Sequence, residues 1–284
     1  NGLGDDTKVA HMHWGGGTPN FFSIGQVNEL MQSLRAHFDF DAGGEYSIEL
    51  DPRAIDAAYV AGLREAGFNR VSIGVQDFDA DVQRAVHRIQ SEEQTLEIIG
   101  AARENGFQSV NIDLIYGLPK QSLVSFERTL ERVIAANPDR IAVYNYAHLP
   151  NLFKPQRRIQ ESELPLPETR LKLLAMAIRR LNVAGYQYIG MDHFAKSNDS
   201  LAIAQRNGLL HRNFQGYSTH ADCDLIGLGV SSIGNVGPTY SQNFRTLEEY
   251  YNALDHNTLP IMRGIELSAD DLLRRAVIGA LMCH

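Results

Sequence analysis

The sequence has little cysteine and no long apolar run, and each shortage excludes a class of protein. Only Cys223 and Cys283 occur, far apart and without a CxxC pair, so the chain offers neither a disulfide framework nor a metal-binding knuckle. We expect both thiols to be buried as small apolar groups. No stretch approaches the roughly 20 apolar residues that span a bilayer, and no leader resembles a secretion signal. We therefore expect a cytoplasmic protein without a membrane partner.

Positive charge is also scarce. The 26 Lys and Arg residues stand against 34 Asp and Glu residues, for a net charge of -8. No basic stripe interrupts the mixed-sign pattern, which argues against nucleic acid as a partner. The 284 residues are 44% hydrophobic, which is enough to bury a full core. We expect a monomer that acts on a small molecule.

Both ends of the sequence indicate a fragment. Residue 1 is Asn, and a strand pattern begins at Val9 with hardly any chain before it. A helical pattern from Ser268 through Leu281 reaches His284 without a glycine or another stop signal. We expect an element to be missing at each end.

Strand and helix patterns alternate along most of the chain. Period-two alternation predicts strands, and a period near 3.6 predicts helices. Ser91 and Ser125 are expected helix N-caps, and Gly67, Gly106 and Gly185 are expected at helix ends, where a left-handed residue is needed. The alternation implies right-handed crossovers and a parallel sheet. The expected strands are 9–14, 45–50, 70–76, 109–115, 140–146 and 188–191, and the expected helices are 24–38, 53–66, 92–104, 126–136 and 168–184.

Polar residues stand at the C-terminal ends of the expected strands, and this separates two folds that share the pattern. A doubly wound sheet would gather them at one switch point, whereas the loops of a β/α barrel converge on one mouth. They follow many different strands here, so we predict an α/β fold with a full or partial parallel β/α barrel over residues 1–192. Residues 193–246 are expected to form a mixed segment over the barrel mouth. Residues 247–284 are expected to begin a small helical part.

The run VAHMHWGGGTPN contains three consecutive glycines, residues 15–17, between a strand and a helix. Glycines give up side-chain packing, so a folded protein keeps three of them where another group approaches the main chain. Alone, the run fits a turn as well as a ligand cradle. Glu49, Gln76 and Asp113 recur at the ends of later strands, and three polar groups in register favour the cradle over a structural network.

Other residues capable of chemistry have a structural alternative. Arg88 can bind a ligand carboxylate or cover a helix end, and alone it favours the surface role. His11 and His13 share one strand face without a carboxylate or cysteine at ligand spacing, so we expect histidines satisfied by neighbours rather than a metal site. A basic loop over residues 154–158 is a candidate anion site on an acidic protein.

Several longer motifs run from the glycine loop to the last helix. They are HMHWGGGTPN, YSIELDPR, RVSIGVQDF with VHRIQ, NIDLIYGLPKQ, RIAVYNYAHLP, GYQYIGMDHFAK, NFQGYSTHADCDLIGLGVSSIG and MRGIELSADDLLRR. Together they resemble the oxygen-independent coproporphyrinogen III oxidase (coproporphyrinogen dehydrogenase) family, radical S-adenosylmethionine (SAM) enzymes of haem biosynthesis. GGGTP is shared by many radical enzymes, whereas GMDHFAK and QGYST resemble the oxidase and not the related haem-chaperone branch.

The resemblance implies a partial β/α barrel in which a [4Fe-4S] cluster, reduced by an electron donor, passes one electron to SAM. The resulting 5′-deoxyadenosyl radical would abstract hydrogen from a propionate side chain of coproporphyrinogen III, and loss of CO2 would leave a vinyl group. Two such steps would give protoporphyrinogen IX. The protein would supply positioning and water exclusion, while the cofactor carries the chemistry.

The resemblance also implies three sets of site residues, none of them assigned a catalytic role. The residues that would contact the methionyl amine and carboxylate of SAM are Gly16, Gly17 and Thr18. Those that would hold the rest of this cofactor are Glu49, Gln76, Arg88 and Asp113. Those that would line a second SAM near the substrate are Ala147, Gln215 and Ile233. We further expect the substrate's propionates to be seated by Lys154, Arg157 and Arg158.

One departure from the family pattern concerns the cluster. The family holds its cluster with a CxxxCxxC loop upstream of the glycine run, and this sequence has no such loop. Cys223 cannot replace it, because it is alone and in the wrong segment. We expect the ligands to lie upstream of Asn1, so the chain as given should hold no cluster and show no turnover.

Two other kinds of protein stay open as alternatives. A haem chaperone of the related radical SAM branch would transfer haem without oxidase activity, although GMDHFAK and QGYST lean against it. An ordinary barrel lyase or isomerase would use the glycine run for a phosphate. This last reading needs a base of near-neutral pKa at the mouth, and no residue is a convincing candidate.

Overall fold

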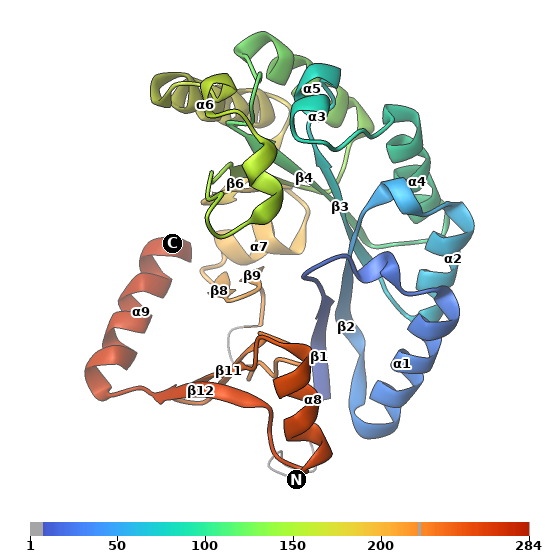
Figure 1. The fold of residues 1–284 in the computed structure, drawn as a ribbon, viewed down its shortest axis with the longest axis vertical. Coiled ribbons are helices and arrows are strands. Elements are labelled where there is room, and N and C mark those ends of the chain that lie inside the picture. The colour runs from blue at the N-terminus through green and yellow to red at the C-terminus, as the bar shows by residue number, and fades with distance from the viewer. Residues whose placement is uncertain (1–7, 221–222, 284) are drawn as a thin grey trace. The chain divides into compact units, whose positions relative to one another are not determined.

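The structure, a computed structural model, describes residues 8–220 and 223–283 (Figure 1). Its contacts divide the chain into two compact units, Asn1–Ile203 and Ala204–His284. The division falls within a short helix, α7 (Ser200–Arg206). Each unit is described by itself.

The first unit is built on a seven-stranded sheet with the order β1-β2-β3-β4-β5-β7-β6. The first five strands pair in parallel with their neighbours. This agrees with the predicted series of strands joined by crossover helices. The strands are β1 (Lys8–Trp14), β2 (Asp39–Leu50), β3 (Arg70–Gln76), β4 (Ser109–Tyr116), β5 (Arg140–Asn145), β6 (Tyr186–Gly190) and β7 (His193–Lys196).

Helices connect the parallel strands and lie in an arc along one side of the sheet (Figure 1). They are α1 (Ile24–His37), α2 (Ala57–Ala66), α3 (Ala80–Ala85), α4 (Glu92–Glu104), α5 (Leu123–Ala136) and α6 (Pro167–Val183). Short 3-10 turns complete the unit: η1 (Pro19–Phe21), η2 (Pro52–Ala54), η3 (Lys154–Arg158) and η4 (Glu161–Glu163).

The core lies between the sheet and these helices, because every second residue of a strand faces them. In β2, Tyr46, Ile48 and Leu50 are buried, whereas Ser47 and Glu49 between them stay partly exposed. The same alternation holds in β3 and β4. The fully buried core side chains include Phe68, Ile73, Ile112, Leu114, Phe126, Leu130, Ile141 and Leu173.

The opposite face of the sheet is polar. Branched apolar residues fill the inside of a closed β/α barrel, but here the corresponding positions carry polar groups, most of which bond to one another or to neighbours. They are His13 on β1, Glu45, Ser47 and Glu49 on β2, Arg70, Ser72 and Gln76 on β3, and Asn111 and Asp113 on β4. This face is therefore suited to hold a polar ligand.

The sixth predicted strand, 188–191, runs in the predicted direction, but it begins two residues earlier, as β6, and β7 separates it from β5. β6 and β7 form an antiparallel hairpin, and β7 pairs antiparallel with β5 through Arg140 and Ala195. The turn passes through Met191, which has a positive φ of 46°. So short a connection cannot return a parallel strand, which needs a crossover of a dozen residues or more. The sheet consequently extends past residue 192, where we expected the barrel to end.

The helix boundaries confirm some of the predicted caps. Ser91 caps α4 by accepting the Gln94 N–H, as expected. Ser125, in contrast, is not an N-cap: α5 begins one turn earlier, with Ser122 as the cap and Ser125 at the third helical position of a capping box. The glycines predicted at helix ends, Gly67, Gly106 and Gly185, all have positive φ, at 107°, 74° and 88°.

Two local features near the strand ends differ from the prediction. The helix expected over 53–66 begins only at Ala57, because Asp51 caps the turn η2 and Asp56 starts a new helix by accepting the Tyr59 N–H. The short helix α3 was not predicted. It begins after Asp79, whose side chain accepts two backbone N–H groups.

The second unit contains a two-stranded and a three-stranded antiparallel sheet. Its helix α9 (Ala269–Cys283) follows the helical pattern predicted from Ser268. Cys283 is buried as predicted, but Cys223 is exposed, so the expectation that both thiols are buried is wrong. The other elements are β8 (His211–Asn213), β9 (Gly216–Ser218), β10 (Ile233–Val236), β11 (Thr239–Asn243), α8 (Leu247–Asp255) and β12 (Ile261–Glu266). Among the described residues, no helix is both long and apolar enough to cross a membrane.

Candidate functional site

The glycine loop follows β1 and leaves main chain uncovered. Gly16 and Gly17 have positive φ of 73° and 57°, which strains any residue with a side chain. A Cβ placed on either would meet no heavy atom within 4 Å. A Cβ on Gly15 would instead lie 2.5 Å from His13 Nε2 and 2.8 Å from Glu49 Oε1. The absence of a side chain at Gly15 thus allows His13 and Glu49 to pack against the loop. Gly16 and Gly17 leave open space beside their main chain.

Glu49 is fixed beside this loop by two neighbours. Its Oε1 lies 3.2 Å from His13 Nε2, and its Oε2 accepts the Gly16 N–H at 3.3 Å. The other ring nitrogen of His13 lies 2.8 Å from Ser47 Oγ. The hydrogen bond with His13 lowers the pKa of Glu49 more than burial raises it. The carboxylate is therefore an ionised acceptor, suited to an amine or to hydroxyl groups.

The turn after the glycine loop is tied to the end of β2. Thr18 is exposed, and its carbonyl accepts the Phe21 N–H at 2.9 Å. Asn20 Nδ2 donates to the Asp51 carbonyl at 3.1 Å, and the Asp51 N–H donates to Asn20 Oδ1 at 2.8 Å. Because Asn20 is only 7% exposed, this pairing is shielded from water and sets where the glycine loop ends.

Gln76 and Arg88 lie side by side at the end of β3. A Cβ on Gly74 would come 2.9 Å from Gln76 Nε2 and 3.2 Å from Arg88 Nη2, so both side chains fill the space over this glycine. Arg88 Nη2 donates to the Gly74 carbonyl at 2.9 Å, and Nη1 donates to Asp51 Oδ2 at 3.2 Å. Arg88 Nε is buried without a hydrogen-bond partner among the described residues. Buried donors are normally hydrogen-bonded, so this N–H is available to donate to an acceptor atom of a ligand.

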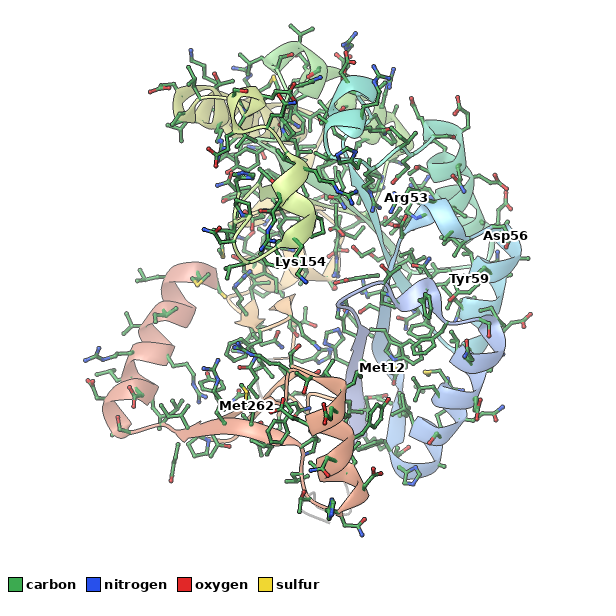
Figure 2. The ribbon with its side chains drawn as sticks, in the orientation of Figure 1. Met12, Arg53, Asp56, Tyr59, Lys154 and Met262 are labelled. Carbon is green, nitrogen blue, oxygen red and sulfur yellow. The ribbon has the colours of Figure 1, made fainter. Side chains whose placement is uncertain are left out.

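Charges shape this corner of the site. Burial lowers the pKa of Arg88, and the neighbouring Asp51 carboxylate partly restores it. Burial raises the pKa of Asp51, but the hydrogen bonds of Arg53 and the charge of Arg88 lower it overall. Arg53, which is labelled in Figure 2, donates from Nη2 to Asp51 Oδ2 at 2.6 Å. The Asp51 carboxylate thus accepts hydrogen bonds from the guanidinium groups of both Arg53 and Arg88.

Asp113 stands on β4 in a polar cluster of its own. Its Oδ2 accepts the Ser72 hydroxyl at 2.8 Å, and its Oδ1 accepts from Asn111 Nδ2 at 2.8 Å. Burial raises the pKa of Asp113 to about 6, although both hydrogen bonds oppose this. The charge of Glu49 raises the same pKa and that of His13 lowers it, so these groups share one electrostatic environment.

The structure thus gathers most of the predicted SAM residues at the C-terminal ends of four adjacent strands. Gly16 bonds Glu49, Gln76 lies beside Arg88, and Asp113 lies within the field of Glu49. The prediction that His13 is satisfied by its neighbours is confirmed. Sequence reasoning missed Asn20, Ser72 and Asn111, although strand alternation puts Ser72 and Asn111 on the same face as Asp113.

The loop after β5 carries the expected substrate residues on the surface. Lys154, Arg157 and Arg158 belong to η3 and are exposed; Lys154 is labelled in Figure 2. Arg157 Nε donates to the Pro150 carbonyl at 3.0 Å. Ala147 is also exposed, and its carbonyl accepts from Gln156 Nε2 at 3.0 Å.

The two remaining candidates belong to the second unit. Gln215 lies in the turn between β8 and β9, where its N–H donates to Asn213 Oδ1 at 2.9 Å. Ile233 begins β10 and is paired with Gln242 on β11. Their part in a second SAM site stays a prediction.

Comparison with known proteins agrees with this fold. The model of the radical SAM superfamily matches residues 3–133, the part that holds the glycine loop and β1 to β4. The structure of coproporphyrinogen III oxidase from Escherichia coli, described as a radical SAM enzyme, superposes with a TM-score of 0.95 at 52% identity. The superposition covers 97% of this chain and 64% of the Escherichia coli chain. The curled sheet with its polar face is therefore a radical SAM partial barrel.

Curated relatives define the family more closely. Oxygen-independent coproporphyrinogen III oxidase from Pseudomonas aeruginosa is 53% identical over 284 residues, 99% of this chain and 62% of the relative. The protein of the same name from Thermostichus vulcanus is 50% identical over 242 residues, 84% of this chain and 74% of the relative. The chain belongs to the oxygen-independent coproporphyrinogen III oxidase family. It spans about three fifths of the length of most of these relatives.

Membership of the radical SAM superfamily implies SAM and a [4Fe-4S] cluster as cofactors. The first unit fits SAM: it offers open glycine main chain, an ionised carboxylate beside it and the unsatisfied Arg88 Nε. The residues do not fit the cluster, which requires several thiolates. The sequence has two cysteines, and both belong to the second unit. Residues 1–284 therefore do not supply the ligands of a cluster.

The packing at Gly15 leads to a first prediction. Gly15→Ala should push His13 and Glu49 apart, because the new methyl would overlap both. Because the displaced atoms are the ends of two partly exposed side chains, we expect a loss of only about 1 kcal/mol in the free energy of unfolding, measured in urea, and a shift of the His13 ring signals in NMR spectra. Gly25→Ala in α1 is the control, since its Cβ would meet only Ser23 Oγ at 3.9 Å. Equal stability of the two variants would contradict the packing.

The buried carboxyl of Asp113 leads to a second prediction. Because the folded-state pKa is raised from 3.8 to about 6, its contribution to stability is fully present below 3.8 and is lost as pH rises through 6. Asp113→Asn should therefore leave stability unchanged near pH 4 and raise it by about 1–3 kcal/mol at pH 7. Urea unfolding at both values tests this, with Asp255→Asn at an exposed position as control. The same difference at pH 4 and pH 7 would refute it.

Proposed function

We propose that the protein containing this chain is an oxygen-independent coproporphyrinogen III oxidase. It would remove the carboxyl groups of two propionate side chains of coproporphyrinogen III and leave vinyl groups, giving protoporphyrinogen IX in haem biosynthesis. The observation that carries the proposal is the superposition on the Escherichia coli enzyme at a TM-score of 0.95 and 52% identity. The clustering of Glu49, Gln76, Arg88 and Asp113 at the strand ends supports it further.

In this proposal, SAM binds along the C-terminal ends of β1 to β4, where it supplies the hydrogen-abstracting chemistry of the reaction. The main chain of Gly16 and Gly17 would accommodate its amino-acid end, because no side chain stands there. Glu49, held by His13 and Gly16, is oriented to accept from the amine or from ribose hydroxyls. Arg88 Nε would donate to a ligand oxygen or nitrogen, and Asp113 would supply a further acceptor.

Other features of the proposal rest on the resemblance and on composition. A second SAM would be bound by Ala147, Gln215 and Ile233. The cluster ligands would come from the protein outside residues 1–284, and a separate electron donor would reduce the cluster. We propose a cytoplasmic monomer that needs neither a membrane nor nucleic acid.

The exposed basic loop would serve the substrate. Coproporphyrinogen III carries several propionates, and the protein has a net charge of -8, so the substrate needs local positive charge. Lys154, Arg157 and Arg158 follow β5, the parallel strand next to β4, and are exposed on η3. Arginine can bind a carboxylate through two parallel N–H groups. We propose that this loop seats propionate groups.

Activity is tested in the protein completed to the length of its relatives, with the cluster reconstituted without oxygen. We expect conversion of coproporphyrinogen III to protoporphyrinogen IX with formation of 5′-deoxyadenosine. Glu49→Gln should lower kcat/KM by about a hundredfold or more, because the carboxylate loses its charge at the SAM site. Glu29→Gln, at an exposed position on α1, should change nothing. Tight haem transfer without 5′-deoxyadenosine would overturn the proposal in favour of a haem chaperone.

The basic loop gives a separate prediction. Replacing Lys154, Arg157 and Arg158 together by Gln should raise KM for coproporphyrinogen III by about tenfold or more, with little change in kcat, because substrate binding loses charged partners. The double variant Lys172→Gln and Arg179→Gln on α6 removes exposed positive charge elsewhere and is the control. If the loop variant and the control have the same KM, the loop does not bind substrate.

A further inference from the structure

Gln76 has a backbone conformation that its residue type disfavours. Its φ is 69°, in the left-handed region, and the Asp77 N–H donates to the Val75 carbonyl at 2.9 Å across it. A hydrogen bond between residues two apart with a positive central φ defines the strained form of the γ-turn. The pairing of β3 with β4 also shifts by one residue between Gly74 and Gln76. Such strain persists only where the surroundings hold it in place.

A buried polar cluster surrounds the residue that follows this turn. The Asp77 side chain accepts three hydrogen bonds: Oδ1 from the Asp79 N–H at 2.7 Å and from the Thr129 hydroxyl at 2.6 Å, and Oδ2 from Gln121 Nε2 at 2.6 Å. The Asp77 carbonyl accepts from Gln83 Nε2 at 3.0 Å. We call Asp77, Gln83, Gln121 and Thr129 the polar hub. All four are buried, and Asp77 and Thr129 are each 1% exposed.

The polar hub reaches the neighbouring elements and so fixes the turn from several sides. Thr129 lies on α5 and also accepts the Phe78 N–H at 3.2 Å. Gln121 accepts the Gly117 N–H at 2.6 Å and donates to the Ile115 carbonyl at 3.0 Å, both beside the end of β4. Burial raises the pKa of Asp77, while the bonds from Thr129, Asp79 and Gln121 lower it. The carboxylate is thus tied to α5, to the end of β4 and to the start of α3.

The turn determines where the Gln76 side chain lies at the end of β3. The turn at Gln76 directs the side-chain amide over Gly74, beside Arg88 Nη2. Without the turn, the chain would continue β3 in the extended conformation and Gln76 would leave this place. We propose that Asp77 is a positioning residue for SAM binding, which acts by holding Gln76 in its strained turn through the polar hub. The proposal rests on the proposed function, because it takes Gln76 to contact SAM.

The test is a double-mutant cycle on SAM affinity in the cluster-loaded protein completed to the length of its relatives. Thr129→Val removes the hydroxyl from the hub at constant shape, and Thr129→Ser keeps it as the matched control. The dissociation constant for SAM is measured by equilibrium dialysis, and folding is checked by urea unfolding. We expect Gln76→Ala and Thr129→Val each to weaken SAM binding by about tenfold, and Thr129→Ser by less than about twofold.

The double variant Gln76→Ala with Thr129→Val decides between positioning and a purely structural role. If the hub acts through Gln76, the double variant binds SAM no more weakly than Gln76→Ala alone. Additive losses, or a Thr129→Val variant that loses stability but keeps its SAM affinity, would overturn the inference and leave the proposed function standing. Unchanged affinity in Gln76→Ala would remove Gln76 from the SAM site and overturn the inference, whereas the proposed function fails only if the completed protein does not convert coproporphyrinogen III. Asp77→Asn in the same cycle gives an independent measurement should Thr129→Val fail to fold.

Discussion

Every strand has two faces, and in this sheet the crossover helices pack against one of them. The apolar residues of β2, β3 and β4 pack against α1, α2, α4 and α5, and this packing fixes which residues must point the other way. A shift of one residue in β2 would turn Glu49 into the apolar core, and the same shift in β4 would turn Asp113 into it. The position of the site is thus a consequence of how the core is packed.

Much of this could be predicted from the sequence, because the signals are local and periodic. Alternation predicted the five parallel strands, and glycines with positive φ at 67, 106 and 185 marked helix ends. The polar residues in register, Glu49, Gln76 and Asp113, predicted a ligand site at the strand ends, and the structure brings them to one end of the sheet. The family resemblance added residues such as Arg88, whose local pattern favoured a surface role but whose partly buried guanidinium bonds to the Gly74 carbonyl.

The features that could not be predicted depend on contacts between distant segments or on local conformations without a sequence signature. Asn20 pairs with Asp51 across 31 positions, and nothing in either residue indicates the other. Arg88 is placed by the end of α3, where His87 has a φ of 55° and the Arg88 N–H donates to the Gln83 carbonyl at 2.9 Å. This helix-ending motif usually has glycine at the position with positive φ. Because histidine stands there, the motif could not be recognised from the sequence. The β6–β7 hairpin was missed because Met191 likewise takes a positive φ without being glycine.

Positive φ recurs where the chain leaves the sheet toward the site, at Gly16 and Gly17 after β1 and at Gln76 at the end of β3. After β1, glycine adopts the conformation without strain, and the absent side chains leave room for a ligand. At the end of β3, a side chain is present, so the conformation is strained and must be held by other contacts. Four hydrogen bonds to buried Asp77 hold it. A glycine at position 76 would remove the strain together with the amide, which explains why strain and a buried polar cluster occur together beside this part of the site.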